Sequence, residues 1–198
     1  MQVESIFFII TLLISIIFHE VAHGYVAYRL GDPTAKSLGR LSLNPLVHLE
    51  WFGSVILPGM MILTGMPFVF GWAKPVPFNV TYFKKPEQGT RLVAAAGPLT
   101  NIALALFGAA MYHLLPLGET GALFFGTLVV INIVLAIFNL LPIPPLDGHH
   151  ILFSLLPRSF DGIKAFLRQY ALIILIAFLV FGFGLIEPLM MFVINILL

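Results

Sequence analysis

Residues 5–30 read SIFFIITLLISIIFHEVAHGYVAYRL, an apolar run interrupted by a single cluster of ionisable side chains. In a helix, about 26 residues rise roughly 39 Å, which is enough to cross a bilayer. Gly31 and Pro33 follow the run, and a glycine with a proline just beyond it typically ends a helix. We therefore predict a membrane-spanning helix over Ser5–Leu30.

The ionisable cluster within this helix has the pattern His-Glu-x-x-His. His19 and His23 are four residues apart, so a helix presents both imidazoles on one face, where they can bind the same metal ion. Glu20 lies beside the first histidine and can act as a general base on a metal-bound water. Ionisable groups inside a membrane span are costly and mark functional sites. We predict that His19 and His23 are metal ligands and that Glu20 is catalytic.

The composition of the whole chain is typical of an integral membrane protein. Of its 198 residues, 60% are hydrophobic and only 10% are charged, whereas soluble domains contain about 25% charged residues. The net charge of +1 gives no indication of nucleic-acid binding. Cysteine is absent, so any metal must be held by histidine and carboxylate groups. Because the N-terminal run lacks a basic flank and a cleavage site, we expect a retained helix and not a signal peptide.

Further apolar runs predict a bundle of helices. We expect clear spans at Gly89–Leu115, Gly121–Leu141 and Ile163–Gly182, a short helix at His149–Pro157, and a partial or tilted helix at Leu185–Leu198. The predicted fold class is an all-α polytopic membrane protein with about four to six transmembrane helices. We expect residues 1–198 to form a single membrane-embedded domain.

Two stretches between the first two clear spans do not have the pattern of ordinary helices. Ser37–Leu43 alternates weakly between polar and apolar residues, as an extended strand does. Trp51–Trp72 is long enough for one span but contains several glycine and proline residues. These favour a re-entrant hairpin, which is tolerated where it packs against protein. We predict a re-entrant or β-like segment here.

The basic residues predict an orientation in the cytoplasmic membrane. Those between Arg29 and Arg91 flank one end of the first two clear spans, whereas the N-terminus and the turn at 116–120 carry only acidic residues. This bias places the N-terminus outside and the basic loops in the cytoplasm. Two spans then separate the basic loops from Asp147, so Trp51–Trp72 is expected to enter and leave on the same side.

A zinc ion bound by two histidines needs a third protein ligand, and catalytic zinc keeps a further position for water. Asp147 is the leading candidate because it follows a proline-rich break at the end of a span, at a similar predicted depth. The alternative is that Asp147 caps the helix that begins near His149. His48 and Glu50 are interfacial and are weaker candidates.

Amide side chains inside the spans are candidates for binding the substrate. Asn139 lies two turns upstream of Asp147 in sequence and could hold the substrate backbone or an oxyanion. Asn101 is a second candidate, although amides in spans also commonly hydrogen-bond between helices. We interpret Asn132 as a packing residue.

Three motifs occur in order along the chain: His19-Glu20-Val21-Ala22-His23, Gly97-Pro98-Leu99-Thr100-Asn101, and Asn139-x-x-Pro142-x-Pro144-x-x-Asp147-Gly148. Together they resemble those of the site-2 protease family of intramembrane zinc metalloproteases, in its short bacterial or archaeal type without a PDZ or CBS domain. The resemblance implies Zn²⁺ held by His19, His23 and Asp147, with Glu20 taking a proton from the bound water.

The resemblance also implies an endopeptidase that cleaves transmembrane segments of other membrane proteins within the lipid bilayer, as in regulated intramembrane proteolysis. The active site would lie nearer the cytoplasmic side. An unwound substrate could pair with a strand at Ser37–Leu43. Two alternatives stay open, a membrane metal-binding or transport protein and a metal-dependent hydrolase of small lipid-embedded substrates. Glu20 favours an enzyme over a transport protein, because transport sites rarely need a residue at the base position.

Overall fold

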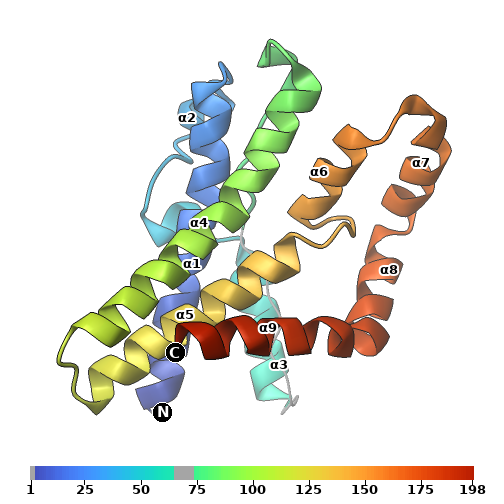
Figure 1. Cartoon of the computed structure of the whole chain (residues 1–198). Helices are drawn as coiled ribbons and strands as arrows, with labels where there is room; N and C mark the ends of the chain where they lie inside the picture. The colour runs from blue at the N-terminus through green and yellow to red at the C-terminus, as the bar shows by residue number, and fades with distance from the viewer. Residues whose placement is uncertain (1–2, 65–73) are drawn as a thin grey trace.

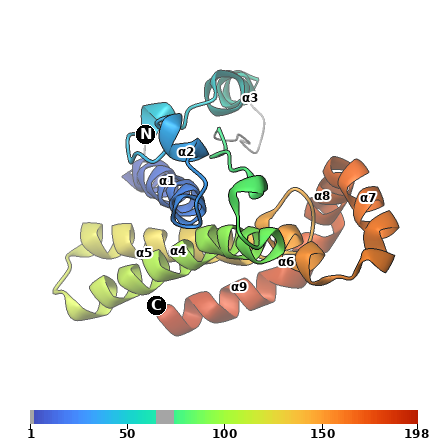
Figure 2. The same ribbon diagram turned by 90° about the horizontal axis from the view of Figure 1, so that it is seen from above.

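Three long helices form the centre of the computed structural model, which describes residues 3–64 and 74–198 (Figure 1). They are α1 (Val3–Arg29), α4 (Pro86–Leu114) and α5 (Glu119–Asn139). A short turn makes α4 and α5 an antiparallel pair. Helix α1 packs on one face of this pair and α9 (Phe183–Leu197) on the other, as Figure 2 shows.

The other described helices are short. They are α2 (Thr34–Ser37), α3 (Leu57–Leu63), α6 (Asp147–Leu155), α7 (Asp161–Gln169) and α8 (Ala171–Ala177), with π-helical turns at Trp51–Ile56 and Phe178–Gly182 and 3₁₀ turns at Pro45–Val47, Val80–Tyr82 and Arg158–Phe160. In the described part of the chain, four helices are long and apolar enough to cross a membrane. The predicted all-α polytopic fold is confirmed.

Small residues allow the central helices to approach closely. Ala105 and Ala109 of α4 pack with Val129 of α5 and Ile194 of α9 in one buried cluster. A Cβ atom on Gly108 would lie only 3.1 Å from the Val129 side chain. Because lipid is as apolar as the core, membrane helices associate through such close packing and through hydrogen bonds, and not through the hydrophobic effect.

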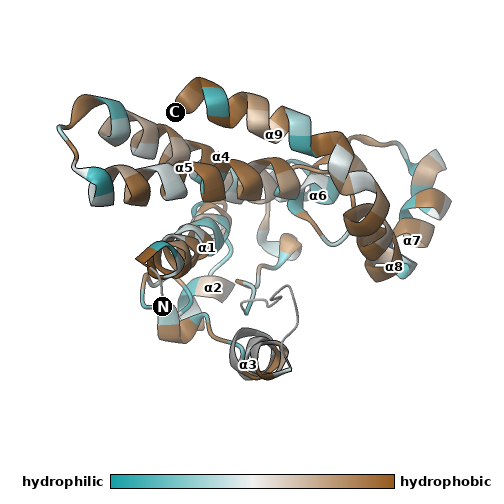
Figure 3. Ribbon diagram, turned by 90° about the horizontal axis from the view of Figure 1, so that it is seen from below, coloured by the Kyte–Doolittle hydropathy of each residue, from teal (hydrophilic) through white to brown (hydrophobic). Residues whose placement is uncertain are grey.

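The C-terminal helices present an apolar surface to their surroundings. Brown residues cover most of α8 and α9 in Figure 3, and Phe181 and Leu185 are 85% and 81% exposed. In the most apolar 18-residue stretch of α4, half of the residues are buried. In the corresponding stretch of Ala171–Leu197, none of the residues is buried. The C-terminal span therefore lies at the periphery of the bundle, where lipid would contact it.

The predicted division of the C-terminal region is wrong. The expected span at Ile163–Gly182 is broken after Gln169, and the helical run Ala171–Leu197 continues through the expected break at Gly182. Lys164 and Arg168 give α7 a polar face, so the fully apolar stretch begins only beyond it. At Gly182 the chain stays helical but changes direction, and α9 turns away from α8 (Figure 1).

The predicted strand at Ser37–Leu43 is also wrong, and no strand occurs among the residues that the structure describes. Ser37 is the last residue of α2, and Gly39 reverses the chain with a φ of +67°. The Arg40 N–H donates to the carbonyl of Ala35 at 2.9 Å, which closes this turn. Local helical and turn hydrogen bonds thus outweigh a weak alternation that has no neighbouring strand to pair with.

Two residues that flank the predicted re-entrant segment, His48 and Lys74, lie together. The Lys74 N–H donates to the His48 carbonyl oxygen at 2.8 Å, and the chain leaves this point through the π-helical turn at Trp51–Ile56 and α3. This contact agrees with a hairpin that enters and leaves on one side. The end of Trp51–Trp72 falls within residues 65–73, which lie outside the described residues.

Candidate metal centre

Three ionisable side chains from distant parts of the sequence converge beside α4. His19 and His23 project from one face of α1, and Asp147 is the first residue of α6. The two Nε2 atoms lie 3.0 Å apart, and Asp147 Oδ2 lies 3.1 Å from His19 Nε2 and 3.3 Å from His23 Nε2. Both imidazoles are buried. The structure therefore brings the two predicted histidines and the predicted aspartate into one group.

The chemistry of this group fits a zinc ion. Zinc–ligand bonds of about 2.0–2.1 Å in a tetrahedron place neighbouring ligand atoms roughly 3.3 Å apart, close to the three separations observed. Asp147 Oδ2 is buried, and among the described residues it faces no polar partner apart from the two imidazole nitrogens. A buried carboxylate oxygen in that position is suited to bind a cation.

The second nitrogen of each imidazole is held by α4. His23 Nδ1 lies 2.7 Å from the backbone oxygen of Val93, which can only accept. The hydrogen is therefore on Nδ1, and Nε2 presents its lone pair to the site. His19 Nδ1 lies 2.5 Å from the side-chain oxygen of Asn101. Such second hydrogen bonds orient metal-binding histidines and raise their basicity.

Helix α4 passes the imidazoles at Gly97. A Cβ atom at this position would lie 2.5 Å from His19 Nε2 and would also clash with His23 Nε2. Any larger residue would therefore displace both rings. The small-residue motif that begins at Gly97 thus provides the space in which the two histidines meet.

The proline-rich loop after α5 positions Asp147. This loop folds back over the start of α6 so closely that a Cβ atom on Gly148 would clash with the Leu140 carbonyl. His149 Nδ1 lies 2.6 Å from the Leu146 carbonyl and closes the turn. The N-cap position of α6 is occupied by Leu146, and Asp147 is the first residue of the helix itself. The alternative role of Asp147 as a cap is not observed.

Glu20 is held by the backbone of the segment that precedes α4. Its Oε2 accepts a hydrogen bond from the Val76 N–H at 2.8 Å. Val76 is buried and packs against α1 at Gly24, where a Cβ atom would lie 2.7 Å from its side chain. The carboxylate is therefore fixed next to His19 by a contact between distant segments, which no pattern along the chain predicts.

The remaining candidates lie outside the metal group. Asn139 donates to the Leu135 carbonyl at 3.0 Å near the end of α5, and its role toward a substrate stays a prediction. Asn101 is fully buried behind His19. His48 Nε2 lies 2.7 Å from the Ser42 carbonyl, and Glu50 accepts from the backbone of the π-helical turn.

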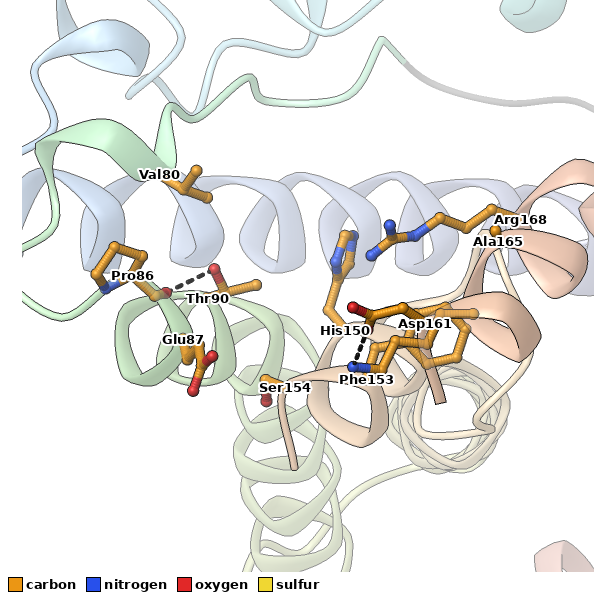
Figure 4. A pocket seen from close by; sticks show the side chains of 11 residues that line it. Val80, Pro86, Glu87, Thr90, His150, Phe153, Ser154, Asp161, Ala165 and Arg168 are labelled. Atoms are coloured by element: carbon orange, nitrogen blue, oxygen red, sulfur yellow. Dashed lines mark hydrogen bonds and ion pairs between the residues drawn. The ribbon is translucent and has the colours of Figure 1, made fainter. Parts of the chain in front are cut away.

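A cleft of about 490 Å³ opens between α4, α6 and α7 (Figure 4). His150 of α6 and Arg168 of α7 both line it, as do Lys164 and Asp161, which pair at 3.0 Å. Burial, and then the charge of His149, lowers the pKa of His150 to about 4. His150 is therefore neutral near pH 7. The cleft gives water a polar approach to the helix that begins with Asp147.

Comparisons with known proteins agree with this geometry. A family model described as Peptidase family M50 matches residues 7–120 and 118–182. YwhC of Bacillus subtilis, named as a candidate zinc metalloprotease, is 42% identical over 172 residues, or 82% of this chain and 74% of that protein.

Two further relatives carry names of the same kind. Rip2 of Mycolicibacterium smegmatis is 32% identical over 173 residues, or 85% of this chain and 64% of its own length. MJ0611 of Methanocaldococcus jannaschii is 35% identical over 142 residues, which are 69% of this chain and 63% of that protein. The chain thus spans less than two thirds of these two proteins. No solved structure matches it.

Proposed function

Since the chain belongs to peptidase family M50, and is thus a zinc metalloprotease of the membrane, we propose that it cleaves transmembrane segments of other membrane proteins within the bilayer. The observation that carries this proposal is the group of His19, His23 and Asp147, with both imidazoles buried, among helices of spanning length. A protease site at this place reaches only peptide bonds that lie in the membrane or at its edge.

We assign the zinc ligands as His19 Nε2, His23 Nε2 and Asp147 Oδ2. Zinc bound there would supply a Lewis acid and a water of lowered pKa. The chain contributes two neutral imidazoles and one carboxylate, so it would leave a net positive charge on the ion. That charge favours a developing anion on the substrate carbonyl oxygen.

Glu20 is the residue that moves protons in this proposal. Its carboxylate takes a proton from the attacking water and then delivers it to the leaving amine. The Val76 N–H holds Oε2, which fixes the direction in which the carboxylate faces. A positioned general base of this kind contributes roughly 10²–10⁴-fold to the rate.

The substrate is a membrane protein whose transmembrane helix unwinds locally. A helical backbone has its carbonyl groups in hydrogen bonds, so a peptide bond must leave the helix before it can be attacked. We further propose that the protein acts in regulated intramembrane proteolysis in the cytoplasmic membrane. The basic loops would then face the cytoplasm, and His19 and His23 would lie toward that side.

Glu20→Gln tests the proposal and separates it from metal transport. The full chain is reconstituted in liposomes with a library of single-span membrane proteins, and zinc content and cleavage are both measured. We expect the variant to retain zinc and to lose roughly 10²–10⁴-fold in cleavage, because only the general base is removed. A chelator should abolish wild-type cleavage and added zinc should restore it.

Glu119→Gln, which changes an exposed carboxylate at the start of α5, is the matched control and should cleave normally. Undiminished cleavage by Glu20→Gln would refute the role of Glu20. A wild-type protein that binds zinc but cuts no substrate in the library would favour a transport or storage function.

A further inference from the structure

Three polar side chains from different helices are linked behind the metal group. Ser15 of α1, Asn101 of α4 and Asn132 of α5 are all 0% exposed. Buried amides in an apolar bundle must be hydrogen-bonded, so their presence alone would indicate only helix association. The direction of each hydrogen bond, however, is set by its neighbours.

The backbone of α5 sets the first hydrogen-bond direction in this network. The amide nitrogen of Asn132 lies 2.9 Å from the Leu128 carbonyl oxygen and 2.8 Å from Ser15 Oγ. The carbonyl can only accept. Ser15 Oγ donates its own hydrogen to the Thr11 carbonyl at 2.6 Å, so it accepts as well. The Asn132 atom that faces both groups must therefore be the NH₂.

Asn132 is the main determinant of the orientation of Asn101, and a longer contact of 3.4 Å from the Asn101 amide nitrogen to the Ser15 backbone carbonyl acts in the same direction. The oxygen of Asn132 lies 2.7 Å from the side chain of Asn101 and requires a donor, so Asn101 turns its NH₂ toward it. The oxygen of Asn101 is then left facing His19 Nδ1 at 2.5 Å. This oxygen also requires a donor, so the hydrogen of the imidazole is on Nδ1.

With its hydrogen on Nδ1, His19 presents the Nε2 lone pair to the metal group. An isolated asparagine would not enforce this state, because an amide rotated by 180° presents NH₂ to the imidazole and selects the opposite tautomer. His23 needs no such relay, since it faces the backbone oxygen of Val93 directly.

We propose that Asn132 is a positioning residue that acts through Asn101 to fix His19 in its zinc-binding tautomer. The inference rests on the proposed zinc site. It assigns to α5 a role in metal binding, although α5 itself supplies no ligand.

The first test is the zinc affinity of the full chain in lipid nanodiscs, measured by competition with a chromophoric chelator. Removing a partner that orients a metal-binding histidine lowers affinity roughly 10–100-fold, and we expect Asn132→Leu to lie at the low end, with about a tenfold loss. If Asn132→Leu does not elute as a folded protein in size-exclusion chromatography, Asn132→Ala is used in its place.

Two control variants separate orientation from packing. Ser15→Ala removes one hydrogen bond of the network but leaves the Leu128 carbonyl to orient Asn132. Thr11→Val changes a buried side chain one turn before Ser15 in α1. The backbone oxygen of residue 11 would still accept the hydrogen bond from Ser15. Both should bind zinc within about twofold of wild type, because neither frees Asn101 to rotate.

The second test reads the tautomer directly. In zinc-free protein with ¹⁵N-labelled histidine at mildly alkaline pH, protonated and unprotonated ring nitrogens give well-separated signals. We expect hydrogen on Nδ1 of His19 in wild type and a mixture of both tautomers in Asn132→Leu. Equal zinc affinity and an unchanged tautomer in Asn132→Leu would overturn the inference, as would an equal loss in Ser15→Ala.

The two proposals fail in different ways. A wild-type protein that binds no zinc would contradict the proposed function, whereas the ¹⁵N spectra would still decide whether Asn132 sets the tautomer. A wild-type protein that binds zinc, with Asn132→Leu identical to it in both measurements, would contradict the relay alone.

Discussion

At the scale of single residues, Gly97 is the point at which α4 packs against the candidate metal group. Its missing side chain leaves room for both imidazole rings. The His-Glu-x-x-His motif would therefore be of no use to this site if α4 carried a larger residue at this position. The two histidines and the helix that packs on them are parts of one arrangement.

Gly97→Ala should lower zinc affinity by about 100-fold, because the added Cβ atom would push both ligand rings apart. The helix itself should not weaken, since alanine in a helix interior is more favourable than glycine by about 1 kcal/mol. Chelator competition measures the first effect and circular dichroism the second.

Gly126→Ala is the matched control, because its nearest neighbour would lie 3.9 Å from the new Cβ atom, which is an ordinary contact. It should bind zinc as wild type does. Unaltered zinc affinity in Gly97→Ala would show that the rings are not confined by α4.

The candidate ligands could be predicted from the sequence to different degrees. His19 and His23 follow from helical spacing, which is local. Predicting Asp147 as a ligand also requires the membrane topology, because the number of crossings between the histidines and Asp147 determines whether they lie at the same depth. For Asn132 the sequence favours only a packing role, since the direction of its hydrogen bonds depends on neighbours from three helices. No pattern along the chain contains that information.

At the scale of elements, Asp32 ties the loop after α1 to the loop before α4. It is fully buried, and it accepts from the Thr34 N–H at 2.9 Å and from the Asn79 N–H at 2.5 Å. Burial raises the pKa of the Asp32 carboxyl, but the Thr34 hydroxyl and the two N–H groups outweigh burial and lower it below its usual value. The charged form therefore stabilises the folded state.

Asp32→Asn should destabilise the protein by about 2 kcal/mol near neutral pH, because one amide atom would face donors that it cannot accept from. A carboxyl with a lowered pKa contributes stability above its unfolded pKa of about 3.9 and loses it as the pH falls toward the folded pKa. The difference between wild type and variant should therefore shrink below about pH 4.

Thermal unfolding in detergent over a series of pH values measures this difference. Asp161→Asn changes an exposed carboxylate that pairs with Lys164 on the surface and should show little effect at any pH. A stability difference between Asp32→Asn and wild type that stays constant as the pH is lowered below about 4 would contradict the assigned role of Asp32.

The elements themselves were predictable where long apolar runs end at clear signals. Helix α1 follows from its composition and from Gly31, which adopts a φ of +109°. The strand at Ser37–Leu43 was wrong because a weak alternation cannot overcome local turn formation. The C-terminal division was wrong because Gly182 bends a helix in apolar surroundings without ending it.

At the scale of the whole molecule, the site depends on an even number of crossings between α1 and α6. Helices α4 and α5 supply two, and the hydrogen bond between Lys74 and His48 joins the ends of the segment that precedes them. If that segment crossed the membrane once, Asp147 would be carried away from the two histidines. The constraint stays a prediction from the sequence, and the contact between Lys74 and His48 agrees with it.

Thiol labelling tests the constraint in a chain that contains no cysteine of its own. We expect Leu46→Cys and Lys74→Cys, both at exposed positions, to react with an impermeant reagent from the same side of sealed vesicles. Glu119→Cys, in the turn before α5, should react only from the opposite side. Labelling of Leu46→Cys and Lys74→Cys from opposite sides would refute the re-entrant segment.

The most direct test of the proposed metal centre is X-ray absorption at the zinc edge, recorded on the full chain in lipid nanodiscs with the zinc content determined in parallel. For the wild type we predict one zinc per chain with two imidazole ligands and oxygen in the remaining positions. For Asp147→Ala we predict an altered oxygen shell and roughly 100-fold weaker binding. A zinc ion without imidazole ligands in the wild type, or an unchanged spectrum and affinity in Asp147→Ala, would contradict the account.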